Sequence, residues 1–191
     1  MKKICWWMGT DALTLIKNPP GNRIWHLKLI FYRLKWRILM RFFDEHWVTE
    51  KHLGEYLKKY RVKEVKIKHD EYKYGKMKKK KHTGFNILYY CPTKPVNLGG
   101  MKYIHWLYGY DVFLELEKNL TGFNFIHISG DSDMSKVYPL TDIYIRPNRH
   151  DGYARMIDEC EANNIPVIKS ENFKPDIKYF INEIKNYYSL L

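Results

Sequence analysis

Short, mostly apolar runs alternate with longer amphipathic stretches along the whole chain. The apolar runs, typical of strands, cover residues 4–8, 46–49, 62–67, 85–90, 123–129, 143–145 and 166–168. The amphipathic stretches, typical of helices, cover residues 12–17, 23–43, 50–60, 111–119, 134–138, 153–163 and 176–191. Strands that alternate with helices favour parallel sheets, and strands without polar alternation favour helices on both sheet faces. The pattern therefore predicts an α/β fold.

The composition changes between residues 69 and 84, where lysines replace aliphatic side chains. The lysines of this stretch are Lys73, Lys76, Lys78, Lys79, Lys80 and Lys81. Such a charge run is typical of a linker or an exposed loop. We therefore predict a first domain at residues 1–70, a lysine-rich linker or loop at residues 71–84, and a second domain at residues 85–191.

The overall composition narrows the class of protein. Hydrophobic residues make up 45% of the 191 residues, which is enough to bury a core and excludes disorder as the overall state. The 33 Lys and Arg residues exceed the 21 Asp and Glu residues and give a net charge of +12. This excess favours an anionic partner, and charge alone leaves nucleic acid, an anionic membrane surface and a phosphorylated ligand open.

Cysteine content and hydropathy indicate the compartment. Because Cys5, Cys91 and Cys160 are widely spaced, we expect neither a disulfide framework nor a metal site. No uncharged run approaches the roughly 20 residues that span a bilayer. The first apolar run is too short for a secretory signal peptide. We therefore expect a cytoplasmic protein.

The most informative segment, residues 146–168, joins two predicted strands through a loop and a helix. The loop holds Asp151, and Gly152 lets the backbone turn tightly and approach a ligand. Backbone amides at the expected helix start are donors for a diphosphate, namely those of Gly152, Tyr153, Ala154 and Arg155. Glu159 lies two turns into the helix, where its carboxylate can accept hydrogen bonds from ribose hydroxyls. Asn163 or Asn164 ends the helix, since asparagine tolerates the left-handed conformation.

This segment resembles the acid-x7-acid signature of retaining GT-B glycosyltransferases, notably family 4. The resemblance rests on Asp151-Gly152, Tyr153, Glu159, Ala162 and Pro166-Val167-Ile168. It implies that Asp151 contacts hydroxyl groups of the donor sugar and that Glu159 contacts the ribose of the nucleotide. Two positions depart from the signature, because Asp151 replaces the usual Glu and Asn164 replaces a common Gly. The implied fold is Rossmann-like and GT-B-like, with parallel sheets, flanking helices and a reduced N-terminal half.

The same resemblance implies further donor-binding residues in the second domain. The loop after residues 85–90 would bring Lys94 and Lys102 to the donor phosphates. Gly130 would form, together with the acid that follows it, the Gly-acid turn after residues 123–129. Arg149 lies at the carboxyl end of a predicted strand, where open α/β sheets bind ligands. We therefore expect Lys94, Lys102, Gly130 and Arg149 at the donor site.

Three residues are candidates for a catalytic role. Asp151 and its neighbour His150 follow a predicted strand directly. In the N-terminal half, the turn Gly9-Thr10-Asp11 resembles the end of the acceptor-side domain that lines the site. Asp11 has an alternative role as the N-cap of the next helix.

Residues 23–43 combine apolar and aromatic side chains with a basic stripe formed by Arg33, Arg37 and Arg41. One interpretation is a core helix with a solvated basic edge. The other is an interfacial helix whose aromatic rings lie in the headgroup zone and whose arginines contact anionic lipid. The pattern leaves both open, and the second would hold the protein at the inner face of a membrane.

Together these features predict an enzyme, a glycosyltransferase that moves a sugar from a UDP or GDP donor to a glycan or lipid-linked acceptor. The resemblance implies retention of configuration, no metal and no cofactor besides the nucleotide-sugar substrate. A homodimer is compatible with the shortened first half. The alternative is a basic α/β module that binds nucleic acid without catalysis, although no nucleic-acid motif is present. The sequence does not identify the sugar, the nucleotide base or the acceptor.

Overall fold

The computed structural model describes residues 2–8, 10–18, 20, 23–68, 75–94, 100–152 and 154–190. The chain divides into two compact units. The first unit comprises Met1–Tyr72 together with His150–Tyr153, and the second comprises Lys73–Arg149 together with Ala154–Leu191. His150, Asp151 and Gly152 thus belong to the first unit although the residues before them in the chain belong to the second, which local sequence patterns do not predict.

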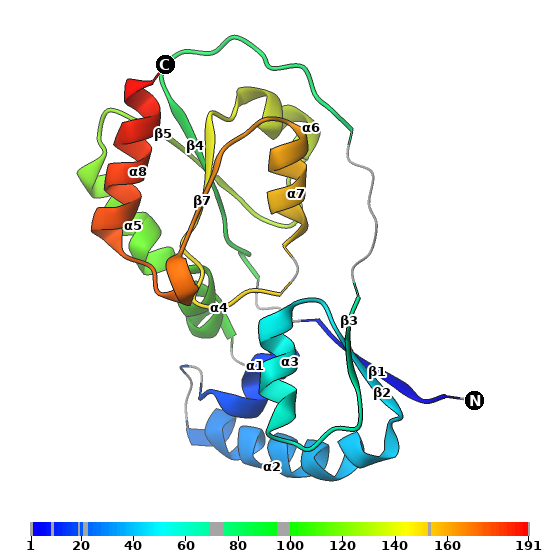
Figure 1. The fold of residues 1–191 in the computed structure, drawn as a ribbon. Coiled ribbons are helices and arrows are strands. Elements are labelled where there is room, and N and C mark those ends of the chain that lie inside the picture. Colours follow the sequence, from blue (N-terminus) through cyan, green and yellow to red (C-terminus); the bar gives the residue numbers. More distant parts are fainter. Residues whose placement is uncertain are drawn as a thin grey trace. The chain divides into compact units, whose positions relative to one another are not determined.

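The first unit contains a three-stranded parallel sheet in the order β1-β2-β3. Its strands are β1 (Ile4–Trp7), β2 (Glu45–Val48) and β3 (Val65–Ile67). The helices of the unit are α1 (Thr10–Ile16), α2 (Arg23–Leu39) and α3 (Lys51–Lys58), and a 3-10 turn at Met40–Phe42 follows α2. Figure 1 shows the strands and helices of this unit as a ribbon. Side chains from β1, β2, α1 and α3 form one core that includes Trp7, Val48, Leu53 and Leu57.

A buried polar pair ties β1 to β2 in this core. The indole Nε1 of Trp7 donates a hydrogen bond of 3.0 Å to Nδ1 of His46. The other ring nitrogen of His46 lies 3.2 Å from the carbonyl oxygen of Met40. Burial lowers the pKa of His46, because the charged imidazolium loses its hydration. His46 is therefore a neutral structural residue of the first unit.

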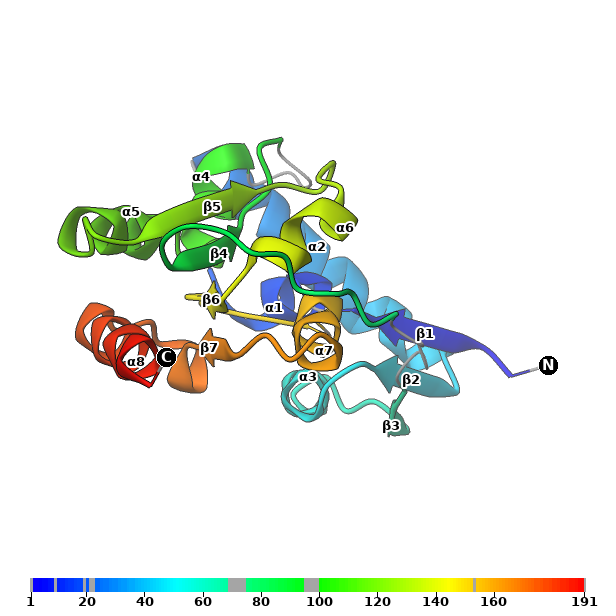
Figure 2. The ribbon, with the colours of Figure 1, turned by 90° about the horizontal axis from the view of Figure 1, so that it is seen from above.

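The second unit contains a four-stranded parallel sheet in the order β5-β4-β6-β7. Its strands are β4 (Asn86–Tyr90), β5 (Asn124–Ile128), β6 (Ile143–Arg146) and β7 (Val167–Lys169). The helices are α4 (Gly100–Tyr108), α5 (Tyr110–Asn119), α6 (Met134–Val137), α7 (Arg155–Ala162) and α8 (Ile177–Ser189). Figure 2 shows α5 and α8 on one side of this sheet and α6 and α7 on the other.

Successive side chains of β4 enter two different cores, as expected for a strand buried on both faces. Ile87 and Tyr89 pack with residues of α4, α5 and α8, including Phe113. Leu88 packs instead with residues of α7, including Cys160. The predicted fold class, an α/β protein of parallel sheets flanked by helices, is confirmed.

Helix α4 is an element that the hydrophobic pattern did not predict. The sequence predicted a loop after residues 85–90 and no helix before residue 111, whereas Gly100–Tyr108 are helical. Lys102 therefore lies on a helix and is exposed, rather than in the loop after β4. The expected helix at residues 153–163 is also shorter, because α7 begins at Arg155 with Ala154 as its N-cap. Gly152 thus precedes the helix and does not belong to its first turn.

The lysine-rich stretch is hydrogen-bonded to the second unit where the structure describes it. The ammonium of Lys79 lies 2.6 Å from the carboxylate of Asp142. The backbone amide of Lys80 donates to the carbonyl of Pro139 at 2.9 Å, and that of Met77 donates to the Asn163 side chain at 2.6 Å. The described part, residues 75–84, therefore follows the surface of the second unit, while Lys73 lies outside the described residues.

Candidate functional site

The candidate donor site is the edge of the second sheet at which all four parallel strands end. Ligands of open α/β sheets bind at this carboxyl edge. After β5, the turn containing Gly130 leads to Asp133, whose side chain accepts a hydrogen bond from the amide of Ser135 and caps α6. After β4, Lys94 lies 3.7 Å from Asp131, and both side chains are exposed. Lys94 and Gly130 thus follow neighbouring strands of this sheet.

Helix α7 follows β6 and therefore begins at the same edge. Its N-cap is Ala154, and the exposed Arg155 is its first helical residue. Helix starts carry backbone N–H donors and a positive partial charge that favour phosphate groups. The helix ends as expected, since Asn164 has a φ of 54° and the amide of Ile165 bonds to the carbonyl of Cys160 at 2.8 Å.

Glu159 lies in the middle of α7 and is half-buried. Its carboxylate accepts a hydrogen bond from the hydroxyl of Tyr138. Burial raises the pKa of Tyr138, and the bond to Glu159 raises it further, so the phenol stays protonated and acts as the donor. Burial also raises the pKa of the neighbouring Cys160 to about 12, which keeps this thiol neutral. Tyr138 therefore orients one carboxylate oxygen of Glu159.

Arg146 is a residue of this edge that the sequence interpretation passed over. It is the last residue of β6, one of the two inner strands of the sheet, and only 8% of its surface is exposed. Its guanidinium donates a hydrogen bond of 2.7 Å to the hydroxyl of Tyr144. A buried cation at the end of a strand is unusual, because desolvation disfavours it unless an anion or hydrogen bonds compensate. The available signal was one basic residue directly after the apolar run Ile143-Tyr144-Ile145.

Arg149 is held by the second unit itself. Its guanidinium forms two hydrogen bonds with the carboxylate of Asp111, at 2.7 and 2.6 Å, and a third with the carbonyl of Trp106 at 2.9 Å. Although burial raises the pKa of Asp111, the guanidinium outweighs that effect and lowers it. These bonds fasten the loop after β6 to α4 and α5. Contact of Arg149 with a donor phosphate stays a prediction.

The loop after β6 also depends on a glycine. Gly109 has a φ of 67°, and a Cβ atom added there would lie 2.0 Å from the carbonyl oxygen of Pro147. The turn between α4 and α5 thus needs both the left-handed conformation and the absence of a side chain. This contact seats Pro147, the residue that directly follows β6.

His150 and Asp151 are held by the first unit. Nε2 of His52 donates to the carbonyl oxygen of Asp151 at 2.8 Å. The His150 ring is buried, and it contacts the ring of His52 edge-on at 5.4 Å and stacks on Tyr56 at 5.9 Å. His52, in the first turn of α3, is a further candidate that the sequence interpretation missed.

Asp11 lies in the first turn of α1, after the carboxyl end of β1. Its carboxylate accepts hydrogen bonds from the amides of Met8 at 3.2 Å and Ala12 at 2.8 Å. These bonds stabilise the start of α1, but Asp11 is the second residue of this helix and not its N-cap, the alternative role considered for it. A catalytic role for Asp11 stays a prediction.

The predicted site residues therefore divide between the two units. Asp11, His150, Asp151 and Gly152 belong to the first, whereas Lys94, Lys102, Gly130, Arg149, Ala154, Arg155 and Glu159 belong to the second. Asp151 and Glu159 thus belong to different units, and Tyr153 lies outside the described residues. Among the residues that the structure describes, no three His, Cys, Asp or Glu side chains form a group that could hold a metal ion.

Comparison with known proteins finds matches among solved structures. No protein-family model matches the chain, and no curated protein matches it. A solved structure of S. aureus TarM shares the fold. The match has a TM-score of 0.57 at 9% sequence identity and covers 88% of this chain. That structure is of a mutant in complex with fondaparinux, alpha-GlcNAc-glycerol and UDP.

The similarity to TarM supports the fold and leaves the activity open. This chain spans about a third of the TarM chain, 36% of its length. At 9% identity, the shared arrangement of strands and helices is what the match establishes. Roles of individual residues have to be argued from the site itself.

Proposed function

We propose that the protein is a glycosyltransferase that uses a nucleoside-diphosphate sugar as donor. The observation that carries the proposal is the shared fold with TarM, a protein solved with UDP and alpha-GlcNAc-glycerol. The acid-x7-acid resemblance of Asp151 and Glu159 supports the same assignment from the sequence. The second unit binds the donor, and the first unit presents a glycan or lipid-linked acceptor.

In this proposal the carboxyl edge of the second sheet binds the nucleotide. Glu159, oriented by Tyr138, accepts hydrogen bonds from the ribose hydroxyls. The backbone amides at the start of α7 donate to the diphosphate, and Arg146, Lys94 and Lys102 supply positive charge. A buried cation interacts with phosphate more strongly than an exposed one, because water screens it less. Arg146 therefore contributes more than the two exposed lysines.

The same groups explain how transfer can proceed without a metal. As the bond between the sugar and the diphosphate breaks, negative charge accumulates on the leaving group. Preorganised amides and cations stabilise that charge. Asp151 orients the donor sugar, while His150 and Asp11 are assigned to the catalytic centre on the acceptor side. Configuration at the anomeric carbon is retained in this proposal, and no strong general base is required.

A screen of nucleotides tests the proposal. The melting temperature of the full chain is measured with UDP, GDP and their sugars, because a ligand that binds the native state raises its apparent stability. We expect one nucleoside diphosphate and its sugar to raise the melting temperature, and an acceptor to be glycosylated in their presence. In parallel, binding to RNA and DNA is titrated with salt. Salt-sensitive nucleic-acid binding without any nucleotide effect would replace the proposal with the binding-module alternative.

A further inference from the structure

Helix α2 buries one face in the first unit. Trp25 and Leu29 are its buried residues. Trp36, about two turns after Leu29 and three after Trp25, contacts Trp7 of β1 edge-on at 4.8 Å. Each residue of an α-helix advances by about 100° around the axis. These three positions therefore fall within one narrow sector, which is the face toward the core.

The opposite face of α2 is also apolar, and it is exposed. Its side chains recur every three or four residues and have exposed fractions between 55% and 69%: Ile24, Leu27, Ile30, Phe31, Leu34 and Ile38. Phe42 continues the series beyond the helix and is 64% exposed. We call this set the α2 stripe. An ordinary surface helix carries polar residues where the stripe lies, so the core-helix interpretation holds for only one face.

Basic residues border the α2 stripe on both sides. At about 100° per residue, Lys28 and Lys35 fall on one flank, and Arg33 and Arg37 fall on the other. The segment from residue 23 to residue 43 contains no Asp or Glu. Long basic side chains can cover apolar surface with their stems while their charged ends reach a polar or anionic layer. An apolar stripe between two basic flanks is the pattern of a helix that lies in a membrane interface.

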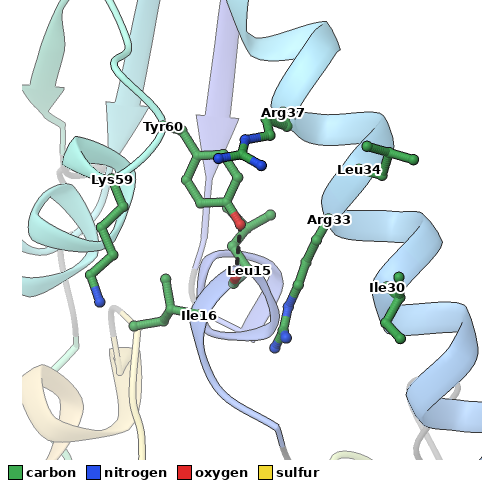
Figure 3. A pocket seen from close by; sticks show the side chains of 8 residues that line it. All are labelled: Leu15, Ile16, Ile30, Arg33, Leu34, Arg37, Lys59 and Tyr60. Carbon is green, nitrogen blue, oxygen red and sulfur yellow. Dashed lines mark hydrogen bonds between the residues drawn. The ribbon is translucent and has the colours of Figure 1, made fainter.

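A pocket adjoins the arginine flank of the stripe. Its volume is about 480 Å³, and it is lined by Leu15, Ile16, Ile30, Arg33, Leu34, Arg37, Lys59 and Tyr60. Figure 3 shows Arg37 pointing from α2 toward Tyr60 and Arg33 pointing from α2 toward Leu15 and Ile16 of α1, with Lys59 on the far side. The Tyr60 hydroxyl donates to the carbonyl of Leu15 at 2.7 Å and so fixes the wall between α1 and α3.

The cations of this pocket differ in what they already bind. Arg33 donates to the carbonyl of Thr14 at 2.8 Å and to the Asn18 side chain at 2.9 Å, so it is a structural residue. Arg37 and Lys59 are exposed, and within the described part of the chain neither forms an ion pair. One cation from α2 and one from the turn after α3 thus flank the apolar residues that line the pocket.

We propose that the α2 stripe and this pocket form a docking surface for an anionic lipid bilayer. The stripe enters the boundary between headgroups and acyl chains, and Arg37 and Lys59 bind the phosphate of an anionic phospholipid. Ile30 and Leu34 belong to both the stripe and the pocket, so the acyl chains of that lipid continue along the stripe. Each basic residue near an anionic surface strengthens the attraction to it.

Charge selects a membrane over the other occupants of such a surface. A second copy would bring two acid-free basic segments together around one interface, and these would repel each other. A nucleic acid would satisfy the cations but leave the apolar stripe in water. No helix among the described residues has the length and apolar character that crossing a bilayer requires. The surface therefore fits peripheral contact with anionic lipid.

Vesicle sedimentation with the full chain tests the proposal. The probes are phosphatidylcholine vesicles with and without phosphatidylglycerol. We expect binding only to the anionic vesicles, weakened by salt and unaffected by inorganic phosphate at constant ionic strength. The stripe variant Phe31→Ser/Leu34→Ser should bind at least about tenfold more weakly, because both side chains lose apolar contact with lipid. Its matched control is Leu114→Ser/Leu190→Ser, which changes two exposed leucines of the second unit.

A second pair of variants tests the role of the cations. Arg37→Glu/Lys59→Glu reverses the two charges of the pocket, and the control Lys178→Glu/Lys185→Glu makes the same change of charge on the exposed side of α8. We expect the first pair to abolish binding and the control to keep most of it. Equal loss in both pairs, binding to neutral vesicles alone, or no binding at all would overturn the proposal. So would a wild-type dimer that the stripe variant converts to a monomer. Because no nucleotide is present, the result is independent of glycosyl transfer.

Discussion

Gly109→Ala is the substitution for which the structure gives the sharpest energetic expectation. The new methyl group would meet the carbonyl of Pro147 at 2.0 Å, while the backbone stays at a φ of 67°. Left-handed backbone costs an L-residue about 1–2 kcal/mol, and an unrelieved clash in a packed region costs about 1–3 kcal/mol. The sum predicts a loss of about 2–5 kcal/mol in the free energy of unfolding.

Gly100→Ala is the control that separates these two costs. Gly100 has a φ of 66°, but no neighbouring atom of the described residues lies within 4 Å of an added Cβ. The free energy of unfolding of Gly100→Ala should therefore fall only by the cost of the left-handed backbone, about 1–2 kcal/mol. Urea unfolding followed by circular dichroism measures both variants. If the two variants lost equal stability, the close approach of Gly109 to Pro147 would be refuted.

Hydrogen exchange measures the effect of Gly109→Ala at individual backbone amides. The amide of Arg149 donates to the carbonyl of Leu107 at 2.9 Å, next to the Gly109 turn. Pushing Pro147 away from the turn should open this bond and speed exchange at Arg149. Exchange at β5, on the far edge of the sheet, should change only as far as global stability does. Unchanged exchange at Arg149 would show that the loop after β6 does not depend on the glycine.

The remaining predictions concern titrating groups. Lys2, Trp47 and Lys66 hydrogen-bond to Glu45 and lower its pKa from the ordinary 4.5 to about 2. This carboxylate therefore stabilises the fold above pH 4.5 and loses that effect as the pH falls toward 2, so the acid-unfolding curve of Glu45→Gln should be flatter there. Burial raises the pKa of Cys160 to about 12 and also raises that of Cys91. Iodoacetamide at neutral pH should thus modify both only after unfolding, and mass spectrometry of the native protein detects any exception.

Much of the second unit could be predicted because its strands are short apolar runs bounded by polar turns. The strand at Ile143–Arg146 and the left-handed Asn164 follow from local patterns of this kind. Helix α4 could not be predicted in the same way. It opens on a glycine rather than a capping side chain, and aromatic and β-branched residues such as Tyr103 and Ile104 have only average helix propensity. Packing against the sheet decides its structure.

Helix α2 shows a different limit of pattern reading. Apolar residues lie on two opposite sectors of its surface, so the sequence indicated a helix but not which sector faces the core. Contact of Trp36 with Trp7 decides that question. The opposite apolar sector is therefore exposed, and its exposure motivates the proposal of a docking surface.

The placement of Asp151 shows a further limit of reasoning from local spacing. Local spacing relates Asp151 to Glu159, and it predicted that one loop and the helix that follows it would carry both. The structure instead bonds the backbone of Asp151 to His52, a residue 99 positions away. Such long-range contacts leave no local signal, and neither does the burial of Arg146 at the end of β6.

Calorimetric titration of nucleoside diphosphates into the wild-type chain, Glu159→Gln and Glu161→Gln tests the central proposal most directly. Glu161 is an exposed residue of the same helix, so its substitution controls for the loss of one charge. We predict that UDP or GDP binds the wild type and Glu161→Gln equally. Glu159→Gln should bind about 1–3 kcal/mol more weakly, because charge-assisted hydrogen bonds to the ribose are lost. Equal affinity in all three proteins, or no nucleotide binding by the wild type, would contradict the account.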